Sequence, residues 1–341
     1  MRVLVTGSCG FLGSHVCELF KGLGWEVIGI DNLTTFEMKR SGYKPSTRYY
    51  TYNLLKKMGI QTLVQDIVNY EKLRDIKIDY IIHTAAQPTM TLSISNPRYD
   101  LMNNVVATFN ILELGRKLDV PVSICSSVHV FGNDINKNLI EEETRFRCIP
   151  ESLNEDNRIL NGEISPLHAS KASTEIYGQA FIDTYGLKVG IMRLTGMYGP
   201  RQFAGMHHGW VSNFIIRILK DLPISIYGND KQVRDILYCT DASRVFLKYY
   251  ENQKPGLYIV GGGPECTISL KEVIGYVSIL LGKEPYIKME KERFGDLYYF
   301  VSDISKASKN LDWRPSVKPC EGLLETTGWI KNNLELFRGI V

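Results

Sequence analysis

The stretch MRVLVTGSCGFLG, residues 1–13, decides the fold. It starts as an apolar run typical of a buried β-strand, passes through a turn with glycine at every third position, and continues into a segment that can form a helix. Gly7 permits a tight turn out of the strand, Gly10 lets the main chain approach a phosphate without a Cβ, and Gly13 lets the helix pack closely on the strand. Because the N–H groups at a helix start attract anions, this stretch predicts a pyrophosphate site.

A second strand is expected at residues 25–30, and it ends in Asp31. An acidic residue about 20 positions after such a glycine turn can accept hydrogen bonds from the ribose hydroxyls of an adenosine. No Arg immediately follows Asp31 to bind a 2′-phosphate. We therefore predict that the cofactor is NAD and not NADP.

Strand and helix patterns alternate through the first half of the chain, and polar or small residues follow the strands. This order predicts an α/β fold with a doubly wound parallel sheet of the Rossmann type, with its site at the carboxyl edge of the sheet. Further strands are expected at residues 61–65, 79–84, 120–125 and 187–193, and helices at 11–23, at 96–118 and from residue 165 onward.

Two segments depart from this alternation. Residues 33–60 form a polar, tyrosine-bearing excursion, and residues 133–165 form a polar, acidic insertion that we expect to be rich in loops. Beyond Gly199 the alternation fails, and a final helix is expected at residues 321–336. We therefore predict an NAD-binding domain over residues 1–195 and a smaller α/β substrate lobe mainly over residues 196–341.

Composition excludes several classes of protein. The 341 residues carry a formal net charge of +3 with no basic block, which argues against a nucleic-acid partner. No apolar run approaches the ~20 residues that a membrane span needs. The seven cysteines contain no Cys-x-x-Cys pair, so reduced thiols are favoured over disulfides or a metal site. We expect a cytoplasmic protein without a bound metal that forms a homodimer or a higher homo-oligomer.

Several longer motifs carry a family resemblance. They are SSVHVFG (126–132), PLHASK (166–171), RLTGMYGPRQF (193–203), GNDKQVRDILY (228–238) and LDWRP (311–315). With the glycine turn, they make the chain similar to extended short-chain dehydrogenases/reductases of the nucleotide-sugar epimerase and dehydratase type over nearly its full length. Within that family the pattern most resembles the CDP-tyvelose 2-epimerases, in ETRFRC, in the insertion before PLHASK and in MYGPRQFAGMHHGWV.

The resemblance implies a tightly held NAD that is reduced and reoxidised while a sugar carbon passes through a ketone, with a CDP-sugar as the favoured substrate. It implies that Ser127 binds the reacting hydroxyl and that Lys171 holds the nicotinamide ribose. A dehydratase or a dehydrogenase of the same family is an alternative. A protein that binds NAD and nucleotide sugar without turnover is another.

The family tyrosine that takes the proton is absent, because the position four residues before Lys171 is Leu167. A positioned acid/base group contributes about 10²–10⁴ in rate. Its replacement could be the adjacent His168, which we take as the catalytic candidate, although it lies ~100° further round a helix. His83, or His207 and His208 in the substrate loop, could also reach inward. The chemistry could instead use a base elsewhere, or be lost.

The remaining expected contacts come from the ends of strands and from the substrate lobe. Asp66 and Ile67 are expected to meet the adenine, small residues after the fourth strand to approach the ligand, and Asn104 to brace the loops. Arg234 and Arg293 match arginines that hold the diphosphate in the family. The cofactor set is Gly7, Gly10, Phe11, Leu12, Gly13, Asp31, Asn32, Asp66, Ile67, Ala85, Ala86, Gln87, Asn104 and Lys171; the substrate set is Ser127, Arg201, Gln202, Arg234 and Arg293.

Overall fold

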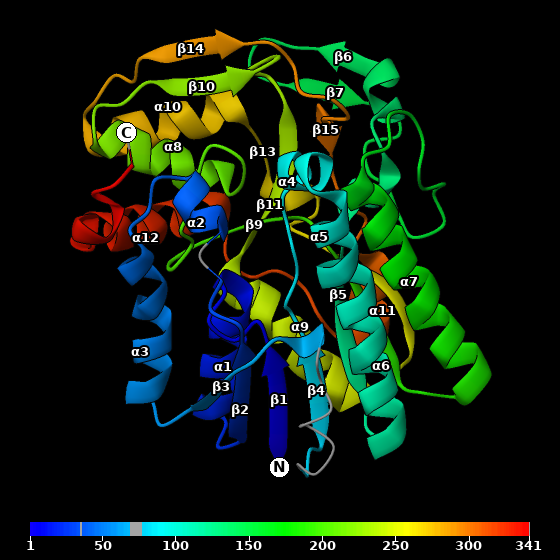
Figure 1. Cartoon of the computed structure of the whole chain (residues 1–341). Helices are drawn as coiled ribbons and strands as arrows, with labels where there is room; N and C mark the ends of the chain where they lie inside the picture. Colours follow the sequence, from blue (N-terminus) through cyan, green and yellow to red (C-terminus); the bar gives the residue numbers. More distant parts are fainter. Residues whose placement is uncertain (35, 69–76, 341) are drawn as a thin grey trace.

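A parallel sheet runs through the centre of the protein (Figure 1), whose computed structural model describes residues 1–34, 36–68 and 77–340. Within these residues its strand order is β12-β8-β5-β4-β1-β2-β3. The strands are β1 (Arg2–Thr6), β2 (Glu26–Asp31), β3 (Gln61–Val64), β4 (Tyr80–His83), β5 (Val122–Ser127), β8 (Val189–Leu194) and β12 (Gly256–Val260). The order reverses between β1 and β4, which is the doubly wound arrangement of a Rossmann-type fold, so the predicted fold class is confirmed.

Helices cover both faces of this sheet and bury its apolar side chains. On one face, α1 (Phe11–Gly22), α9 (Cys239–Asn252) and α11 (Ser305–Leu311) share a core with β1 and β8. On the other face, α6 (Ala107–Leu118) and α7 (Pro166–Tyr185) pack on β4 and β5. Because both faces are covered, the strands read as continuous apolar runs instead of alternating ones.

A second layer of structure lies above the carboxyl edge of the sheet in Figure 1. It has its own hydrophobic core, to which three helices contribute buried side chains. Its helices are α8 (Trp210–Leu219), α10 (Leu270–Leu281) and α12 (Pro319–Asn332), and its strands are β9 (Gly196–Tyr198), β10 (Ile224–Tyr227), β11 (Val233–Tyr238), β13 (Thr267–Ser269), β14 (Ile287–Glu290) and β15 (Tyr299–Phe300). These elements roof the edge at which the site was predicted.

Part of the chain beyond the predicted domain boundary at residue 195 belongs with the first domain. The chain returns to the main sheet after that point, because β12 pairs in parallel with β8 and forms an edge of the sheet. Helices α9 and α11 also pack with α1 in the core of the first domain. The sequence missed this return because β12 is short and runs directly into the glycine-rich turn VGGGPE, which was interpreted as part of an irregular lobe.

The two departing segments are more ordered than expected. The excursion contains α2 (Phe36–Arg40), a 3₁₀ turn η1 (Pro45–Arg48) and α3 (Tyr49–Lys57). The insertion contains an antiparallel hairpin of β6 (Leu139–Glu141) and β7 (Phe146–Cys148). An ion pair between Arg145 and Glu272, with 2.6 Å between Nη2 and Oε2, ties this hairpin to α10. The insertion therefore belongs physically with the upper layer.

Two predicted helices also differ in detail. The helix expected at residues 96–118 is α5 (Pro97–Leu101), a π-helical turn η3 (Met102–Val106) and then α6. The last helix ends at Asn332, and a 3₁₀ turn η7 (Leu334–Phe337) follows.

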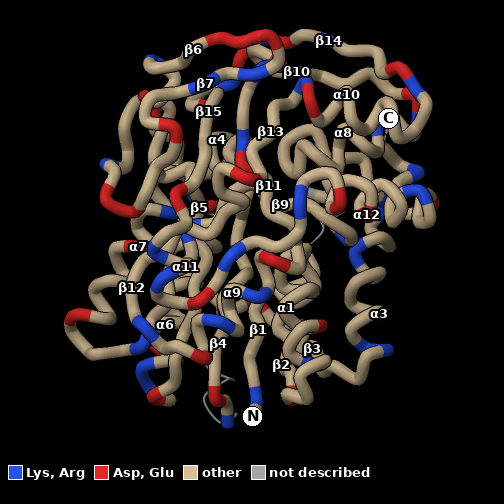
Figure 2. Tube along the Cα trace, turned by 180° about the vertical axis from the view of Figure 1, so that it is seen from behind, with Lys and Arg blue, Asp and Glu red and all other residues tan. Residues whose placement is uncertain are grey.

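Acidic and basic positions are interspersed along the trace in Figure 2. No described helix is long and apolar enough to cross a membrane.

Candidate active site

The glycine turn lies at the point where the strand order reverses. Gly7 follows β1 with a φ of +68°, and a Cβ on it would lie 2.7 Å from the Cα of Ala85, which follows β4. A Cβ on Gly13 would overlap the carbonyl oxygen of Gly7. The two strand ends therefore meet closely only because these positions carry no side chain. In open α/β sheets, ligands bind in the crevice at this point.

The start of α1 presents its backbone to the same crevice. Gly10 is the N-cap residue, and no side chain caps the helix there. The first N–H groups of a helix, here those of Phe11 and Leu12, have no partner within the helix. Together with the close-packed turn, they form a cradle that fits the pyrophosphate of NAD.

Asp31 occupies the end of β2, next to this cradle, and its carboxylate is almost fully engaged. Oδ2 accepts the N–H of Cys9 at 2.9 Å, and Oδ1 accepts the N–H of Leu33 at 2.8 Å. Oδ1 also lies 2.7 Å from Nη2 of Arg48, whose Nη1 donates to the carbonyl of Cys9 at 2.7 Å. Sequence reasoning missed Arg48 because it lies in the excursion, 17 residues beyond Asp31.

The next strand end brings the expected adenine contacts to the same edge. Asn32 donates from Nδ2 to Oδ2 of Asp66 at 3.1 Å, so the residues that follow β2 and β3 touch. Ile67 is buried, and its carbonyl accepts a hydrogen bond from Asn110 at 3.2 Å. Asp66 and Ile67 are thus held beside the Asp31 corner of the sheet.

The loop after β4 is held by a buried amide network. Asn104, in the π-helical turn, accepts the N–H of Gln87 at 2.9 Å and donates to the Gln87 carbonyl at 3.1 Å and to Ser170 Oγ at 3.1 Å. The side chain of Gln87 donates to Asp100 at 2.8 Å. Asn104 therefore braces the loop against α7, and Gln87 turns its amide into the interior and away from a ligand. Ala85 and Ala86 precede it on the loop.

Ser127 ends β5, and Lys171 on α7 bonds to the same strand. The ammonium of Lys171 donates to the carbonyl of Cys125 at 3.0 Å and keeps further N–H groups for a ligand. Burial lowers the pKa of Lys171, and the nearby Cys125, Asp100 and Glu175 partly offset this effect. Ser127 accepts the N–H of His129 at 3.3 Å. This places a hydroxyl and a cation on the same strand end.

Leu167 and His168 begin α7, and both are buried. The N–H of Leu167 donates to Ser93 Oγ at 3.1 Å, while its side chain is 2% exposed. His168 Nδ1 accepts the N–H of Ser165 at 3.0 Å and lies 2.7 Å from Ser165 Oγ, which caps the helix. Burial, followed by the neighbouring His129, lowers the pKa of His168 to about 4.

The other predicted histidines have structural contacts. His83 lies between Thr6 Oγ1, at 2.7 Å from Nδ1, and Thr108 Oγ1, at 3.1 Å from Nε2. Burial, followed by Lys171, lowers the pKa of His83 to about 3. His208 bonds the Phe203 carbonyl through Nε2 at 3.0 Å, on the turn that also carries His207. Since both ring nitrogens of His83 are occupied by threonines, it is a poor proton acceptor for a ligand.

Arg234, on β11, brings the upper layer to the Ser127 corner. Its guanidinium bonds the carbonyls of Val233 and Leu297, and Nη2 lies 3.5 Å from Oδ1 of Asp296. Burial, followed by the charge of Arg234, lowers the pKa of His129 to about 4. The positive charge of Arg234 therefore disfavours protonation of His129. His129 stands within the motif SSVHVFG, residues 126–132, whose pattern does not single it out.

The other three predicted substrate residues differ in their surroundings. Arg293 stacks on Tyr227, with 3.6 Å from its Cζ to the ring centroid, and donates to the Met206 carbonyl at 2.7 Å. Arg201 pairs instead with Glu18 and His15 on α1, at 2.6 Å from Glu18 Oε2.

Gln202 also makes interior contacts. It bonds the Met197 carbonyl at 2.9 Å and the hydroxyl of Ser212 at 2.7 Å. Arg201 and Gln202 therefore direct these polar groups to partners within the fold.

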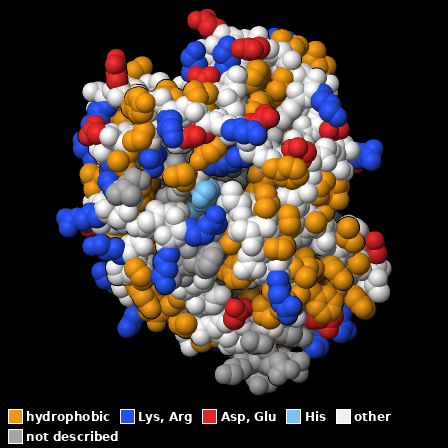
Figure 3. All heavy atoms as spheres, turned by 45° about the horizontal axis from the view of Figure 1, so that its top comes forward, with side chains coloured by type: hydrophobic (Ala, Val, Ile, Leu, Met, Phe, Trp, Pro, Cys, Tyr) orange, Lys and Arg blue, Asp and Glu red, His pale blue; other side chains and the backbone are white. Residues whose placement is uncertain are grey.

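Figure 3 shows Lys and Arg side chains around a hollow near the centre of the upper face.

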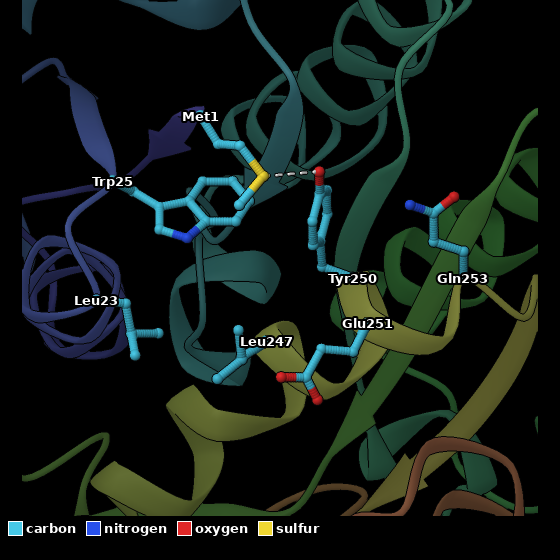
Figure 4. Close-up of a pocket in the computed structure, with 7 residues that line it drawn as sticks. All are labelled: Met1, Leu23, Trp25, Leu247, Tyr250, Glu251 and Gln253. Carbon is cyan, nitrogen blue, oxygen red and sulfur yellow. Dashed lines mark hydrogen bonds between the residues drawn. The ribbon is translucent and has the colours of Figure 1, made fainter.

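A separate hollow lies at the opposite edge of the sheet (Figure 4). It is open, has a volume of about 470 Å³, and is lined by residues that precede β1 and β2 and by α9. Tyr250 bonds the sulfur of Met1 there, at 3.3 Å. Since the glycine turn and Ser127 follow the strands at the other edge, this hollow is not part of the candidate site.

The model of the NAD dependent epimerase/dehydratase family matches residues 3–261. The chain belongs to this family. Gly7, Asp31, Ser127 and Lys171 all lie within the matched residues. Within the described residues, no group of three His, Cys, Asp or Glu side chains could hold a metal ion.

Individual members of the epimerase/dehydratase family are similar over the full length. A UDP-glucuronate 4-epimerase of Thermodesulfobacterium geofontis is 31% identical, over 99% of this chain and 98% of the relative. A CDP-paratose 2-epimerase of Salmonella typhi is 29% identical, over 96% and 99% respectively. The crystal structure of a Bacillus cereus UDP-glucuronic acid 4-epimerase with UDP-glucuronic acid and NAD superimposes with a TM-score of 0.83 at 26% identity, covering 98% of this chain and 100% of that one.

Proposed function

We propose that this chain is an NAD-dependent epimerase of a nucleotide-diphosphate sugar that inverts one alcohol carbon through a keto sugar. The observation that carries the proposal is the meeting of three elements at one corner. Ser127 ends β5, Lys171 from α7 donates to the carbonyl of Cys125 on the same strand, and the charge of Arg234 on β11 acts on His129. In the proposed roles, a hydroxyl-binding group, a ribose-binding cation and a diphosphate-binding cation would share one crevice.

The chain's own residues would divide the work along that crevice. Bound NAD supplies hydride acceptance and return. The start of α1 and the glycine turn would hold its pyrophosphate, and the Asp31 corner its adenosine ribose. Lys171 would hold the nicotinamide ribose, and Ser127 would orient the reacting hydroxyl of the sugar. Placing the reacting groups in this way lowers the barrier by removing their freedom before the reaction.

The substrate proposal begins with CDP-sugars. The motifs of the sequence resemble those of CDP-tyvelose 2-epimerases, and a CDP-paratose 2-epimerase is among the full-length relatives. UDP-sugars are the second class, because a UDP-glucuronate 4-epimerase is equally similar in length and identity. Arg234 and Arg293 would hold the diphosphate, a group for which the arginine fork is well suited.

The test is a panel of CDP- and UDP-hexoses incubated with the purified protein and NAD. We expect one sugar to be converted into a mixture with its epimer, without net production of NADH. A dehydratase would instead release a deoxy-keto sugar, and a dehydrogenase would accumulate NADH. Binding without any product would favour the non-catalytic alternative, for which the buried leucine at position 167 is the supporting observation.

A homodimer is proposed from an exposed apolar face. Ile176 and Tyr177 on α7 are 63% and 42% exposed, and Phe109 on α6 is 40% exposed, with its ring centroid 5.7 Å from that of Tyr177. Leu101 on α5 is 51% exposed. Such a patch on neighbouring helices is typical of an interface.

A cytoplasmic location is also proposed, because all seven cysteines are free thiols.

A further inference from the structure

Two buried histidine nitrogens at the candidate site have no hydrogen-bond partner among the described residues. They are Nδ1 of His129, after β5, and Nε2 of His168, in the first turn of α7. The two rings meet edge to face at 86°, with 5.9 Å between their centroids. Buried polar atoms are normally satisfied, so two unpaired atoms on neighbouring rings leave hydrogen-bonding capacity that a ligand could use.

The proton positions on these rings are constrained by their neighbours. A backbone N–H can only donate, so the Ser165 N–H makes Nδ1 of His168 an acceptor. Neutral His168 must then carry its proton on Nε2, which is the unpaired atom. His168 therefore offers a donor, and His129 Nδ1 on the ring packed against it can offer an acceptor when its proton is on Nε2.

A donor and an acceptor side by side match a hydroxyl group, which both accepts and donates a hydrogen bond. We propose that a sugar hydroxyl binds between the two rings, with His129 Nδ1 taking its proton and His168 Nε2–H donating to its oxygen. The pair then supplies the acid/base function that Leu167 cannot. This inference rests on the proposed function, because the hydroxyl is that of the carbon to be inverted.

The position of His129 supports its role as the acceptor. It stands two residues after Ser127, and its N–H bonds to Ser127 Oγ, the atom expected to orient the same hydroxyl. On oxidation, the O–H bond would break toward His129, the C–H electron pair would leave as hydride to NAD, and the C–O bond would become a carbonyl. On return, hydride would add to the opposite face and His129 would give the proton back.

The charges around the pair set its protonation state. The charge of Arg234 on β11 acts on His129, and Nη2 of Arg234 lies 3.5 Å from Oδ1 of Asp296. On the α7 side, His168 faces His129 itself, and the carboxylate of Glu163 bonds the N–H of Gly295, next to the His168 ring. Burial and Arg234 keep His129 neutral at pH 7, which is the form that can accept a proton. A diphosphate on Arg234 would cancel part of its charge and raise the pKa of His129.

The kinetic test compares wild type with His129→Gln, His168→Ala and His168→Gln. We expect kcat of His129→Gln to fall by about 10²–10⁴, with unchanged NAD content. We expect His168→Ala to lose less and His168→Gln to recover part of that loss, because the Gln amide also donates. In the wild type, the acidic limb of the pH profile should lie at higher pH for kcat than for kcat/KM, because a bound diphosphate raises the pKa of His129. In His129→Gln this limb should vanish.

The second readout needs no turnover. The ring C–H signals of His129 should titrate near pH 4 in the NAD-bound protein and shift upward when UDP is added as a probe of the diphosphate site. Full kcat in His129→Gln, or a His129 titration that UDP leaves unchanged, would overturn the pair while leaving the epimerase proposal standing. Absence of any epimer from wild type over the whole panel would overturn both.

Discussion

Arg48 and Asp31 form a buried ion pair at the corner expected to hold the adenosine ribose. Nη2 of Arg48 lies 2.7 Å from Oδ1 of Asp31, and the side chains are 13% and 3% exposed. A carboxylate at this corner repels a 2′-phosphate, whereas a guanidinium would attract one. The preference of the protein for NAD over NADP therefore depends on whether the ribose contacts the carboxylate of Asp31 or the guanidinium of Arg48.

Asp31→Ser should raise the affinity for NADP by about 10- to 100-fold, as one charge-assisted hydrogen bond contributes ~1.5–3 kcal/mol. The reason is that the substitution removes the repelling carboxylate and frees Arg48 for the 2′-phosphate. Calorimetric titration of both proteins with NAD and NADP measures the change. The double variant Asp31→Ser with Arg48→Met is the control and should lose the gain. Wild type binding NADP better than NAD would contradict the cofactor assignment.

Arg234→Met should weaken the binding of CDP and UDP by about 10- to 100-fold, because their diphosphate loses a charged partner at ~1.5–3 kcal/mol. The matched control is Arg147→Met, whose arginine is 52% exposed and pairs with Glu142 on the hairpin. Thermal unfolding of both variants separates lost binding from lost fold, since Asp296 is also left without its partner. Unchanged affinity in a folded Arg234→Met protein would place the diphosphate elsewhere.

Leu167→Tyr should lower activity. The leucine is 2% exposed, so a larger ring must displace its neighbours, at a typical cost of ~1–3 kcal/mol in stability. Since His129 takes the proton in the proposed reaction, the new phenol brings no benefit. Leu167→Phe is the control for size alone. Activity of Leu167→Tyr above wild type, with Leu167→Phe below it, would show that the missing phenol is a lesion.

Ile176→Asp should convert the protein into a monomer, because it places a charge at the centre of the exposed patch on α6 and α7. Ile279→Asp on α10 is the matched control, since Ile279 is 85% exposed and lies on another face. Light scattering coupled to gel filtration gives the mass of each. A monomeric wild type would contradict the dimer, and so would an Ile176→Asp protein that keeps a dimer's mass.

The sequence predicted the first domain well because its signals are local. The glycine turn and the buried strand patterns fix a doubly wound sheet, and six of its strands lie close to the expected residues. The edge strand β12 was missed because its neighbour in the sheet, β8, lies more than 60 residues earlier, and no local pattern reports such pairing. The helices α2 and α3 were missed because polar, tyrosine-rich segments give a weak helical signal.

The site was predictable to the extent that its residues stand in motifs. Ser127 and Lys171 follow from motif spacing, and the structure places both at the end of β5. Arg201 stands in the motif that begins in β8. The direction of its side chain, however, depends on its backbone φ of +67° and on its ion pair with Glu18, and a motif reveals neither. Arg48 gains its importance from Asp31, and His129 gains its importance from Arg234 and His168. All of these neighbours are distant in the sequence.

The most direct test of the account is a single turnover of the NAD-bound protein in D₂O with the sugar that the panel identifies. Transient oxidation followed by hydride return predicts a brief rise in NADH absorbance and an epimer without deuterium at the inverted carbon. Deuterium at that carbon, or an epimer formed with no NADH transient, would contradict the account.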